Sequence, residues 1–567
     1  MLAAPGRNGK NAPVEVSPIE VLDSPSAAAV GTVVTDNDGT PPRSETWLRV
    51  LCHLAAELPL VIFGIVELVK GWRPLSDNAD LALRSYQVLT SHTPLVGHQM
   101  AVSVGPHAVF GPGPLQSWIL AVPVRIDPVQ GALWGAVLAA VVAIAVAIEA
   151  TWAVAGWRGA ATTAGCVLVL AIVRPEVVLD PVWNVWFALL FLVATFCTAL
   201  AVATGRLGWW PVTVIGASVV VQCQAAYAPP AVALCLVAPA LGLIARPHPK
   251  SSRLRWLVAG LVGGIAVWVA PFVQEVTTSP GNLTLLVRAA GSGPTIGPTA
   301  ALRALGGATR VPPAWVHPLP TGGGLAQFYG VAGLVDGPEW WGLAVVGLLA
   351  MIGVVAARTG RRALAMLSAL TVVLAVGGVV MVASIPLSQF LVLGYLGAML
   401  APVGLAVWVT FLWAVGEAAL VGVRRIRGRE GGGASVELVA YLRWPTAVAL
   451  VGLSTWATVV GLGQMGGTAP TLSGWPAVRA TERASGAAIR IAPRGTFRLR
   501  IEGPPNAFTF SVETGVAYQL AARGFDPRPT TAIGFPTFGR PPDHGPTVVM
   551  VVPGPDRPVG VRLESGS

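Results

Sequence analysis

Residues 130–155 read QGALWGAVLAAVVAIAVAIEATWAVA, and Glu149 is the only charged residue in this stretch. An α-helix rises about 1.5 Å per residue and the hydrocarbon core of a bilayer is about 30 Å thick, so about 20 apolar residues are enough to cross it. The stretch is longer than that and almost free of charge. It therefore predicts a transmembrane helix.

Ten further apolar stretches of similar character lie elsewhere in the chain. They cover approximately residues 47–70, 160–178, 184–204, 210–228, 230–246, 255–275, 340–358, 363–384, 388–423 and 443–463. The stretch 388–423 is too long for one simple crossing, and we expect Pro402 to kink or break it because proline removes a helical hydrogen bond. The predicted fold class is a polytopic α-helical membrane protein with about eleven transmembrane helices.

The composition of the whole chain supports this fold class. Of its 567 residues, 54% are hydrophobic and 11% are charged, whereas a soluble domain carries about 25% charged residues. The mean hydropathy is +0.67, which excludes a soluble enzyme for most of the chain. The net charge is +10, but basic residues form no long run, so we expect no nucleic-acid partner. The five cysteines lack CxxC spacing, and we expect no disulfide framework, no metal site and no cofactor.

Basic residues indicate the orientation, because cytoplasmic loops of membrane proteins carry an excess of Lys and Arg. If the N-terminus is cytoplasmic, most basic turns fall inside; these contain Arg158, Arg206, Arg246, Lys250, Arg253, Arg255, Arg358, Arg361, Arg362, Arg424, Arg425, Arg427 and Arg429. We therefore predict N-in, C-out topology, with a disordered cytoplasmic tail over 1–45 and a membrane domain over 46–463. The long connections 71–129 and 276–339 are then outer loops.

Residues 464–567 differ in character from the membrane domain. Thr496–Ile501 and Thr547–Val552 have the pattern of strands, and Ser511–Arg523 has helical spacing and ends before Gly524, a residue favoured at helix C-caps. We expect a small extracytoplasmic α/β or α+β domain, which could bind an envelope protein partner.

Polar side chains gather just after the first apolar stretch. Asp77 and Asp80 are three residues apart and would share one face of a helix, and Arg84 follows Asp80 at ion-pair spacing. The alternative to a functional site is a solvated helix start, with Ser76 or Asp77 as the cap and an exposed Asp80–Arg84 pair.

Three further polar insertions fall on the same predicted outer face. They contain Arg174, Glu176, Asp180, Trp183 and Asn184; Gln222, Gln224 and Tyr227; and Gln274, Glu275 and Asn282. A polar side chain at membrane depth costs about 1–3 kcal/mol unless it is paired. Gln222 and Gln224 are therefore expected to face a polar interior, where they either bond neighbouring helices or contact a ligand. The tryptophans and tyrosine could equally form the aromatic belt of a membrane protein.

These residues resemble the GT-C superfamily of membrane glycosyltransferases, whose catalytic acid lies in the first outer loop. The stretches D-x-A-x4-R-x3-V from Asp77, H-T-P-L-V-G from His92, G-P-L from Gly113, D-P-x-W-N from Asp180, Q-x-Q-x2-Y from Gln222 and P-G-N-L from Pro280 look like those of a group of actinobacterial GT-C-like proteins. The resemblance covers about residues 45–290 by motif and the remainder by hydropathy alone.

The resemblance implies sugar transfer from a polyprenyl-phosphate carrier to an envelope glycan or lipid acceptor, at the outer face of a bacterial plasma membrane. Asp77 would be the general base, Asp80 the second candidate, and Arg84 and Arg174 would balance the leaving phosphate. Trp118, Trp183 and Tyr227 would stack on the sugar or line the lipid groove. The other substrate-binding candidates are His92, His107, Glu176, Asp180, Asn184, Gln222, Gln224, Gln274, Glu275 and Asn282.

Two positions depart from the pattern of this group. Gln224 stands where relatives often have histidine, and Phe110 begins a Phe-Gly-Pro-Gly-Pro stretch where they often have His-Pro-Gly-Pro, with His107 three residues upstream. Two other functions therefore stay open, a transporter or flippase for a lipid-linked sugar and a non-catalytic envelope scaffold. A transporter would need charged residues at mid-membrane on several helices, and only Glu67 and Glu149 stand out.

Overall fold

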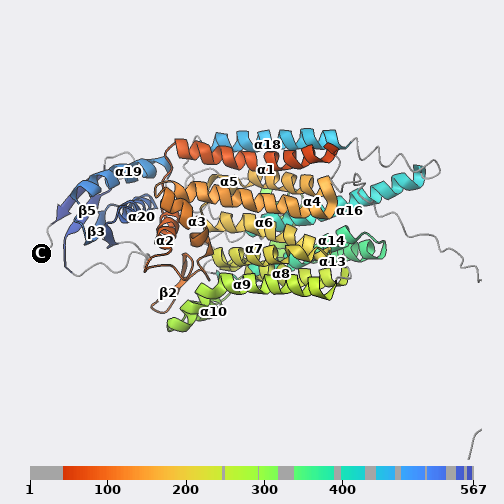
Figure 1. Cartoon of the computed structure of the whole chain (residues 1–567), viewed down its shortest axis with the longest axis horizontal. Coiled ribbons are helices and arrows are strands. Elements are labelled where there is room, and N and C mark those ends of the chain that lie inside the picture. Colours follow the sequence, from red (N-terminus) through yellow and green to blue (C-terminus); the bar gives the residue numbers. More distant parts are fainter. Residues whose placement is uncertain are drawn as a thin grey trace, which may run out of the picture. The chain divides into compact units, whose positions relative to one another are not determined.

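The computed structural model is a bundle of long helices followed in the chain by a small sheet domain (Figure 1). It describes residues 43–245, 249–291, 293–316, 337–387, 398–427, 442–465, 474–504, 507–530, 544–553 and 559–564. Residues Trp47–Ser567 belong to one compact unit. Among the described residues, nine helices are long and apolar enough to cross a membrane, so the chain has the character of a polytopic helical membrane protein.

The long apolar helices follow the predicted stretches closely. They are α1 (Arg43–Val69), α4 (Gly131–Val173), α6 (Asn184–Ala203), α8 (Ala228–Ala245), α9 (Lys250–Thr277), α13 (Glu339–Arg358), α14 (Arg362–Ser384), α16 (Leu400–Arg427) and α18 (Arg443–Met465). The predicted stretch 210–228 is instead a short helix, α7 (Trp210–Cys223), that follows η1 (Leu207–Trp209) and precedes η2 (Ala225–Tyr227).

Helix α4 reverses direction in its middle. Ala155 and Gly156 have non-helical backbone angles, and Gly156 has φ +61°, in the left-handed region that glycine adopts freely. The Thr163 hydroxyl donates to Thr151 over 2.9 Å, although twelve residues would separate the two by about 18 Å along a straight helix. Helix α4 is therefore two antiparallel helices, which correspond to the predicted stretches 130–155 and 160–178.

The bundle has two ends, which we name the α2 end, after α2 (Asp77–Gln87), and the turn end, after the reversal of α4. At the α2 end, Gln130 before α4 donates over 2.9 Å to a carbonyl at the end of α1, and Asn184 at the start of α6 donates over 2.9 Å to the last carbonyl of α7. At the turn end, Arg49 near the start of α1 donates over 2.8 Å to Glu149 of α4.

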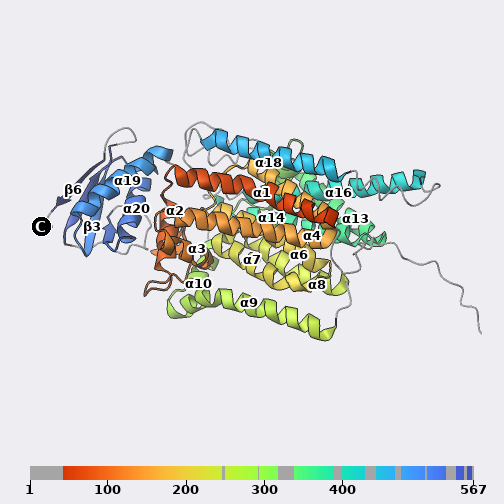
Figure 2. The ribbon, with the colours of Figure 1, turned by 45° about the horizontal axis from the view of Figure 1, so that its top comes forward.

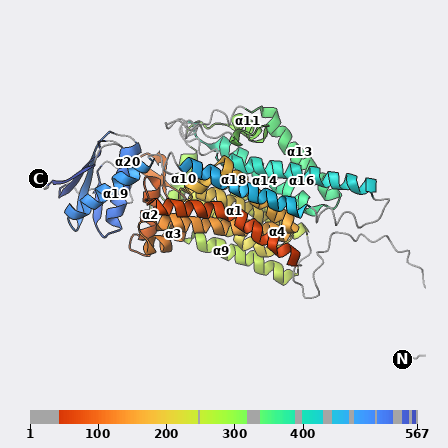
Figure 3. The same ribbon diagram turned by 90° about the horizontal axis from the view of Figure 1, so that it is seen from above.

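Helix α6 forms the centre of the bundle, where it packs against α4, α7 and α8. It contains no charged residue and is apolar on every side, as a helix surrounded by others must be. Helix α14 packs on α8, α13 and α16, and α9 covers α7 (Figure 2). Helices α1 and α18 lie side by side (Figure 3), with the rings of Trp47 and Trp444 5.3 Å apart.

The connection 71–129, expected as an outer loop, is largely ordered secondary structure. It holds α2, the antiparallel hairpin of β1 (Gln99–Val104) and β2 (His107–Phe110), and α3 (Leu115–Ile126). The connection 276–339 holds α10 (Asn282–Ala290) and α11 (Pro298–Thr309), while residues 292 and 317–336 lie outside the described part of the chain.

The structure describes the predicted stretch 388–423 only from residue 398 onward. Helix α16 begins at Leu400, so Pro402 lies in its first turn, where a missing N–H costs no helical hydrogen bond. Three parts of the predicted segments lie outside the described residues: 388–397 of the stretch 388–423, residue 246, and 1–42 of the predicted tail. Helix α1 begins at Arg43, within that predicted tail.

The C-terminal domain is a mixed α/β domain. Its sheet has the strand order β4-β3-β5-β6, in which β3 runs parallel to β4 and β5, and β5 runs antiparallel to β6. The bounds are α19 (Gly474–Ile491), β3 (Thr496–Glu502), α20 (Ala507–Ala521), β4 (Asp526–Pro529), β5 (Thr547–Val551) and β6 (Gly560–Glu564). Phe497, Leu499 and Ile501 alternate along β3 and are buried. Strands β3 and β5 and helix α20 lie where the sequence predicts two strands and a helix, so these predictions are confirmed.

Candidate active site

Helix α2 carries both candidate aspartates and lies mostly inside the protein. Residues 78–85 are buried, and Asp80 is only 1% exposed. The Arg84 guanidinium donates through Nε to Asp80 over 3.0 Å, so the expected ion pair forms. The Ser76 side chain makes no capping hydrogen bond. The alternative of an exposed Asp80–Arg84 pair at a solvated helix start is therefore wrong, because the protein encloses both side chains.

His98 joins the two aspartates. It lies directly before β1, and its Nδ1 is 2.8 Å from Asp80 Oδ2, while its Nε2 is 3.7 Å from Asp77 Oδ1. The Asp80 carboxylate thus meets His98 and Arg84 together. The Asp77 side chain is 40% exposed, so the two aspartates have different surroundings, one enclosed and one open.

The pKa of His98 reflects opposing effects. Burial lowers it, because a charged imidazolium loses solvent; the carboxylates of Asp77 and Asp80 raise it, and the Arg84 guanidinium lowers it. The outcome is a pKa above the ordinary value for histidine. This favours an imidazolium that donates from both ring nitrogens, one toward each aspartate.

The second polar insertion completes the surroundings of Asp77. Trp183, just before α6, donates through Nε1 to Asp77 Oδ2 over 3.2 Å. The neighbouring Asn78 donates through Nδ2 to Asp180 Oδ1 over 2.9 Å. Trp183 and Asp180, more than one hundred positions away in the sequence, therefore hold the first residues of α2 in place.

Asp180 is a desolvated carboxylate of the α2 end. Desolvation raises its pKa to about 8, the hydrogen bonds from Asn78 and the backbone of Trp183 oppose this, and nearby Asp77 and Glu67 add to it. Asp180 is therefore mostly protonated at neutral pH. Glu67, near the end of α1, is 1% exposed, and neither of its carboxylate oxygens has a hydrogen-bond partner in the described structure.

The fourth polar insertion braces the hairpin rather than reaching Asp77. Asn282 accepts from the backbone N–H of Phe110 over 2.9 Å and donates to its carbonyl over 3.1 Å. Gln274 and Glu275 accept from the first backbone N–H groups of α10, over 2.9 and 2.7 Å. The Phe110 ring in turn lies 5.1 Å from the guanidinium of Arg84, so the aromatic residue at this position packs on the buried cation.

The third polar insertion is buried between helices. Gln222 accepts from the backbone N–H of Leu115 over 3.3 Å and donates to the carbonyl of Val267 over 2.8 Å. Gln222, Gln224 and Tyr227 are 1%, 6% and 0% exposed. Of the two functions considered for Gln222, the structure shows interhelical hydrogen bonding.

The remaining candidates are the neighbouring charges Arg174 and Glu176 and the exposed histidines His92 and His107. Arg174 caps α4 and is buried, and in the described part of the structure neither its Nε nor one carboxylate oxygen of Glu176 has a partner. His92 occupies an exposed turn, with its Nδ1 3.2 Å from the Ser91 hydroxyl. His107 lies at the exposed tip of the β1–β2 hairpin.

The C-terminal domain holds the segment that leads into α2. Thr514 of α20 accepts from the backbone N–H of Ser76 over 2.9 Å, and the Tyr518 hydroxyl donates to the carbonyl of Pro128. Arg73 lies 3.4 Å from Glu482 of α19. The position of Asp77 therefore depends on a domain more than four hundred residues away in the chain.

His98 is the residue of this site that the sequence did not single out. It directly follows the H-T-P-L-V-G stretch, and that adjacency is the signal that could have found it.

No group of three or more His, Cys, Asp or Glu side chains that could hold a metal occurs among the residues that the structure describes. No protein-family model matches the chain, and no curated protein matches it.

Proposed function

We propose that this chain is a membrane glycosyltransferase of the GT-C type, which moves a sugar from a polyprenyl-phosphate donor to a hydroxyl of an envelope glycan or lipid. One observation carries the proposal. Asp77 is a half-exposed carboxylate that Trp183 and His98 flank at the end of an apolar helix bundle, while its neighbour Asp80 is enclosed.

In this proposal Asp77 is the general base. It takes the proton of the acceptor hydroxyl while that oxygen bonds to the anomeric carbon of the sugar, and the bond from that carbon to the phosphate oxygen breaks. The polyprenyl phosphate leaves with the electron pair. A positioned base of this kind contributes about 10²–10⁴-fold to the rate.

Asp80 and Arg84 position the base rather than touch the substrate, because both are enclosed and bonded to each other. Asp80 holds His98 at Nδ1, so that its Nε2 faces Asp77. An imidazolium there orients Asp77 and offers positive charge to the leaving phosphate.

The proposed topology has eleven crossings, with the N-terminus cytoplasmic and the α2 end outside a bacterial plasma membrane. It counts α4 as two crossings and adds α7 to the remaining long helices. The arginine-rich turns at the other end support this orientation through the positive-inside rule. The C-terminal domain then lies outside, beside α2.

The test uses the purified chain in liposomes that contain radiolabelled polyprenyl-phosphate arabinose or mannose, with an envelope glycan as acceptor. We expect a labelled glycosidic product from the wild type and at least a 100-fold loss with Asp77→Asn, in line with the contribution of a general base. Glu564→Gln, which changes a carboxylate on the edge strand of the C-terminal sheet, is the matched control and should retain activity.

Full activity of Asp77→Asn would contradict the proposal. Movement of the labelled lipid across the bilayer without any product would instead indicate a flippase. Binding of the donor without turnover or movement would indicate a non-catalytic scaffold.

A further inference from the structure

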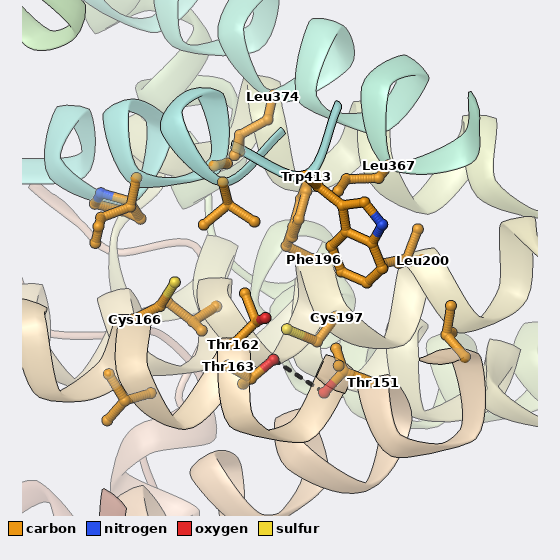
Figure 4. A pocket seen from close by; sticks show the side chains of 18 of the residues that line it. Thr151, Thr162, Thr163, Cys166, Phe196, Cys197, Leu200, Leu367, Leu374 and Trp413 are labelled. Carbon is orange, nitrogen blue, oxygen red and sulfur yellow. Dashed lines mark hydrogen bonds between the residues drawn. The ribbon is translucent and has the colours of Figure 1, made fainter. Parts of the chain in front are cut away.

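An apolar pocket opens between α4, α6, α14 and α16, in the half of the bundle nearest the turn end (Figure 4). Its wall runs along α4 from Gly159 to Leu170, about 16 Å of helix at 1.5 Å per residue. Across the pocket lie Phe196 and Leu200 of α6 and Trp413 of α16. With its open mouth included, the pocket holds about 840 Å³ of space between atoms.

The threonine side chains in the wall already have partners. The Thr151 hydroxyl donates to the Ala147 carbonyl over 2.9 Å and accepts from Thr163 over 2.9 Å, the contact drawn in Figure 4. The Thr162 hydroxyl donates to the Arg158 carbonyl over 2.8 Å. A polar occupant would lose its hydration without new hydrogen bonds from these groups. The chemistry of the wall therefore fits a hydrocarbon chain.

Arginines occupy the ends of the helices that form the pocket. Arg158 lies one helical turn from the lining residue Thr162, Arg206 follows the end of α6, and Arg362 begins α14, five residues before the lining residue Leu367. Basic side chains beside a gap between transmembrane helices attract the phosphate of an anionic lipid. Helices that line the pocket thus carry arginines at or beside their ends nearest the turn of α4.

We propose that this pocket binds one acyl chain of an anionic phospholipid, whose phosphate lies among the arginines of the turn end. The site is at the opposite end of the bundle from Asp77 and does not depend on the glycosyl-transfer proposal. The lipid comes from the leaflet at the turn end, and its chain fills the space that α4, α6, α14 and α16 leave between them.

The first experiment uses the wild-type chain in phosphatidylcholine nanodiscs with a phosphatidylglycerol that carries a photoreactive diazirine near the end of one acyl chain. We expect cross-links concentrated in peptides of the pocket wall, 157–170 and 192–200. Unlabelled phosphatidylglycerol should reduce them at least tenfold, whereas added phosphatidylcholine or polyprenyl phosphate should not.

Three results would overturn the proposal. Cross-links spread over the outer surfaces of α9 and α18, without enrichment in the pocket peptides, would show ordinary boundary lipid. Equal competition by phosphatidylcholine would show that the arginines do not select an anionic lipid. Equal competition by polyprenyl phosphate would assign the pocket to an isoprenoid chain instead.

Two variants on one helix give a matched comparison. Ala406 of α16 lines the pocket and is 9% exposed, whereas Val415 of the same helix is 66% exposed. Ala406→Trp should fill the pocket and reduce the cross-link at least tenfold, and Val415→Trp should leave it unchanged. The double variant Arg158→Gln with Arg362→Gln, which leaves the cavity intact, should abolish the preference for phosphatidylglycerol; an unchanged preference would count against the proposal.

Discussion

The site at the α2 end and the pocket near the turn end are built on different principles. At the α2 end, charged and polar side chains bond one another: Arg84 and His98 meet Asp80, and Trp183 meets Asp77. At the turn end, the pocket wall is apolar and its threonines bond within the protein. A polar network inside a protein holds a reacting group in a fixed geometry, whereas an unfilled apolar cavity accepts any chain of suitable width. Chemistry is therefore expected at one end and lipid binding at the other.

The largest expected effect separates the two ends by function. Asp77→Asn should lower glycosyl transfer by about 10²–10⁴-fold, the contribution of a general base, and leave the phosphatidylglycerol cross-link intact. Ala406→Trp should reduce the phosphatidylglycerol cross-link and leave glycosyl transfer intact. Both quantities are measured on the same nanodisc preparations. If either variant changes both readouts to the same extent, the two ends do not act separately.

The next effect concerns stability at the α2 end. Asp80→Ala leaves the buried Arg84 without its carboxylate, and removal of one partner of a buried ion pair costs about 3–5 kcal/mol. The thermal midpoint of the detergent-solubilised protein should fall accordingly. Arg562→Ala, in an exposed ion pair of the C-terminal sheet, is the control and should cost about 0–1 kcal/mol. Equal shifts for the two variants would show that Asp80 is not enclosed.

A smaller effect should depend on pH. The pKa of His98 is higher in the folded protein than in the unfolded chain, where it is about 6.5. The stability that its imidazolium contributes is therefore complete below about pH 6.5 and is lost as the pH rises through the folded pKa. The groups that face it are Asp77, Asp80 and Arg84.

His98→Gln should therefore lower the thermal midpoint most at acidic pH, by the equivalent of about 1.5–3 kcal/mol for a charge-assisted hydrogen bond. The difference from the wild type should shrink as the pH rises above 6.5. His107→Gln, at the exposed hairpin tip, is the matched control. A constant difference as the pH rises would mean that His98 is neutral in the folded protein.

Much of the fold could be predicted from the sequence because membrane insertion depends on local composition. The apolar stretches alone locate the long helices, and the two stretches on either side of Gly156 correspond to the two halves of α4. The C-terminal strands follow from alternation such as Phe497, Leu499 and Ile501. Which helices are neighbours does not follow, because every face of α6 is apolar and gives no direction to its packing.

In the candidate site, too, local contacts could be predicted from the sequence and tertiary contacts could not. Spacing along one helix predicts the Asp80–Arg84 pair, since it requires only a local conformation. The contacts from Trp183 to Asp77 and from Asn78 to Asp180 join residues 106 and 102 positions apart, and His98 reaches Asp80 through the path of the chain before β1. Such contacts depend on tertiary packing, so the sequence could indicate polar residues on one face but not their partners.

The smallest expected effect tests whether the α2 end depends on the C-terminal domain. Thr514→Val removes the acceptor of the Ser76 backbone N–H at nearly constant volume, which should cost about 0.5–1.5 kcal/mol. Because Ser76 directly precedes Asp77, glycosyl transfer should fall a few-fold while the cross-link at the turn end stays unchanged. Thr496→Val, which removes a hydrogen bond to Asp526 in the same domain, controls for general loss of stability. If Thr514→Val lowers the thermal midpoint but not the transfer rate, the domain stabilises the bundle without positioning Asp77, and the polar network of the α2 end is complete without it.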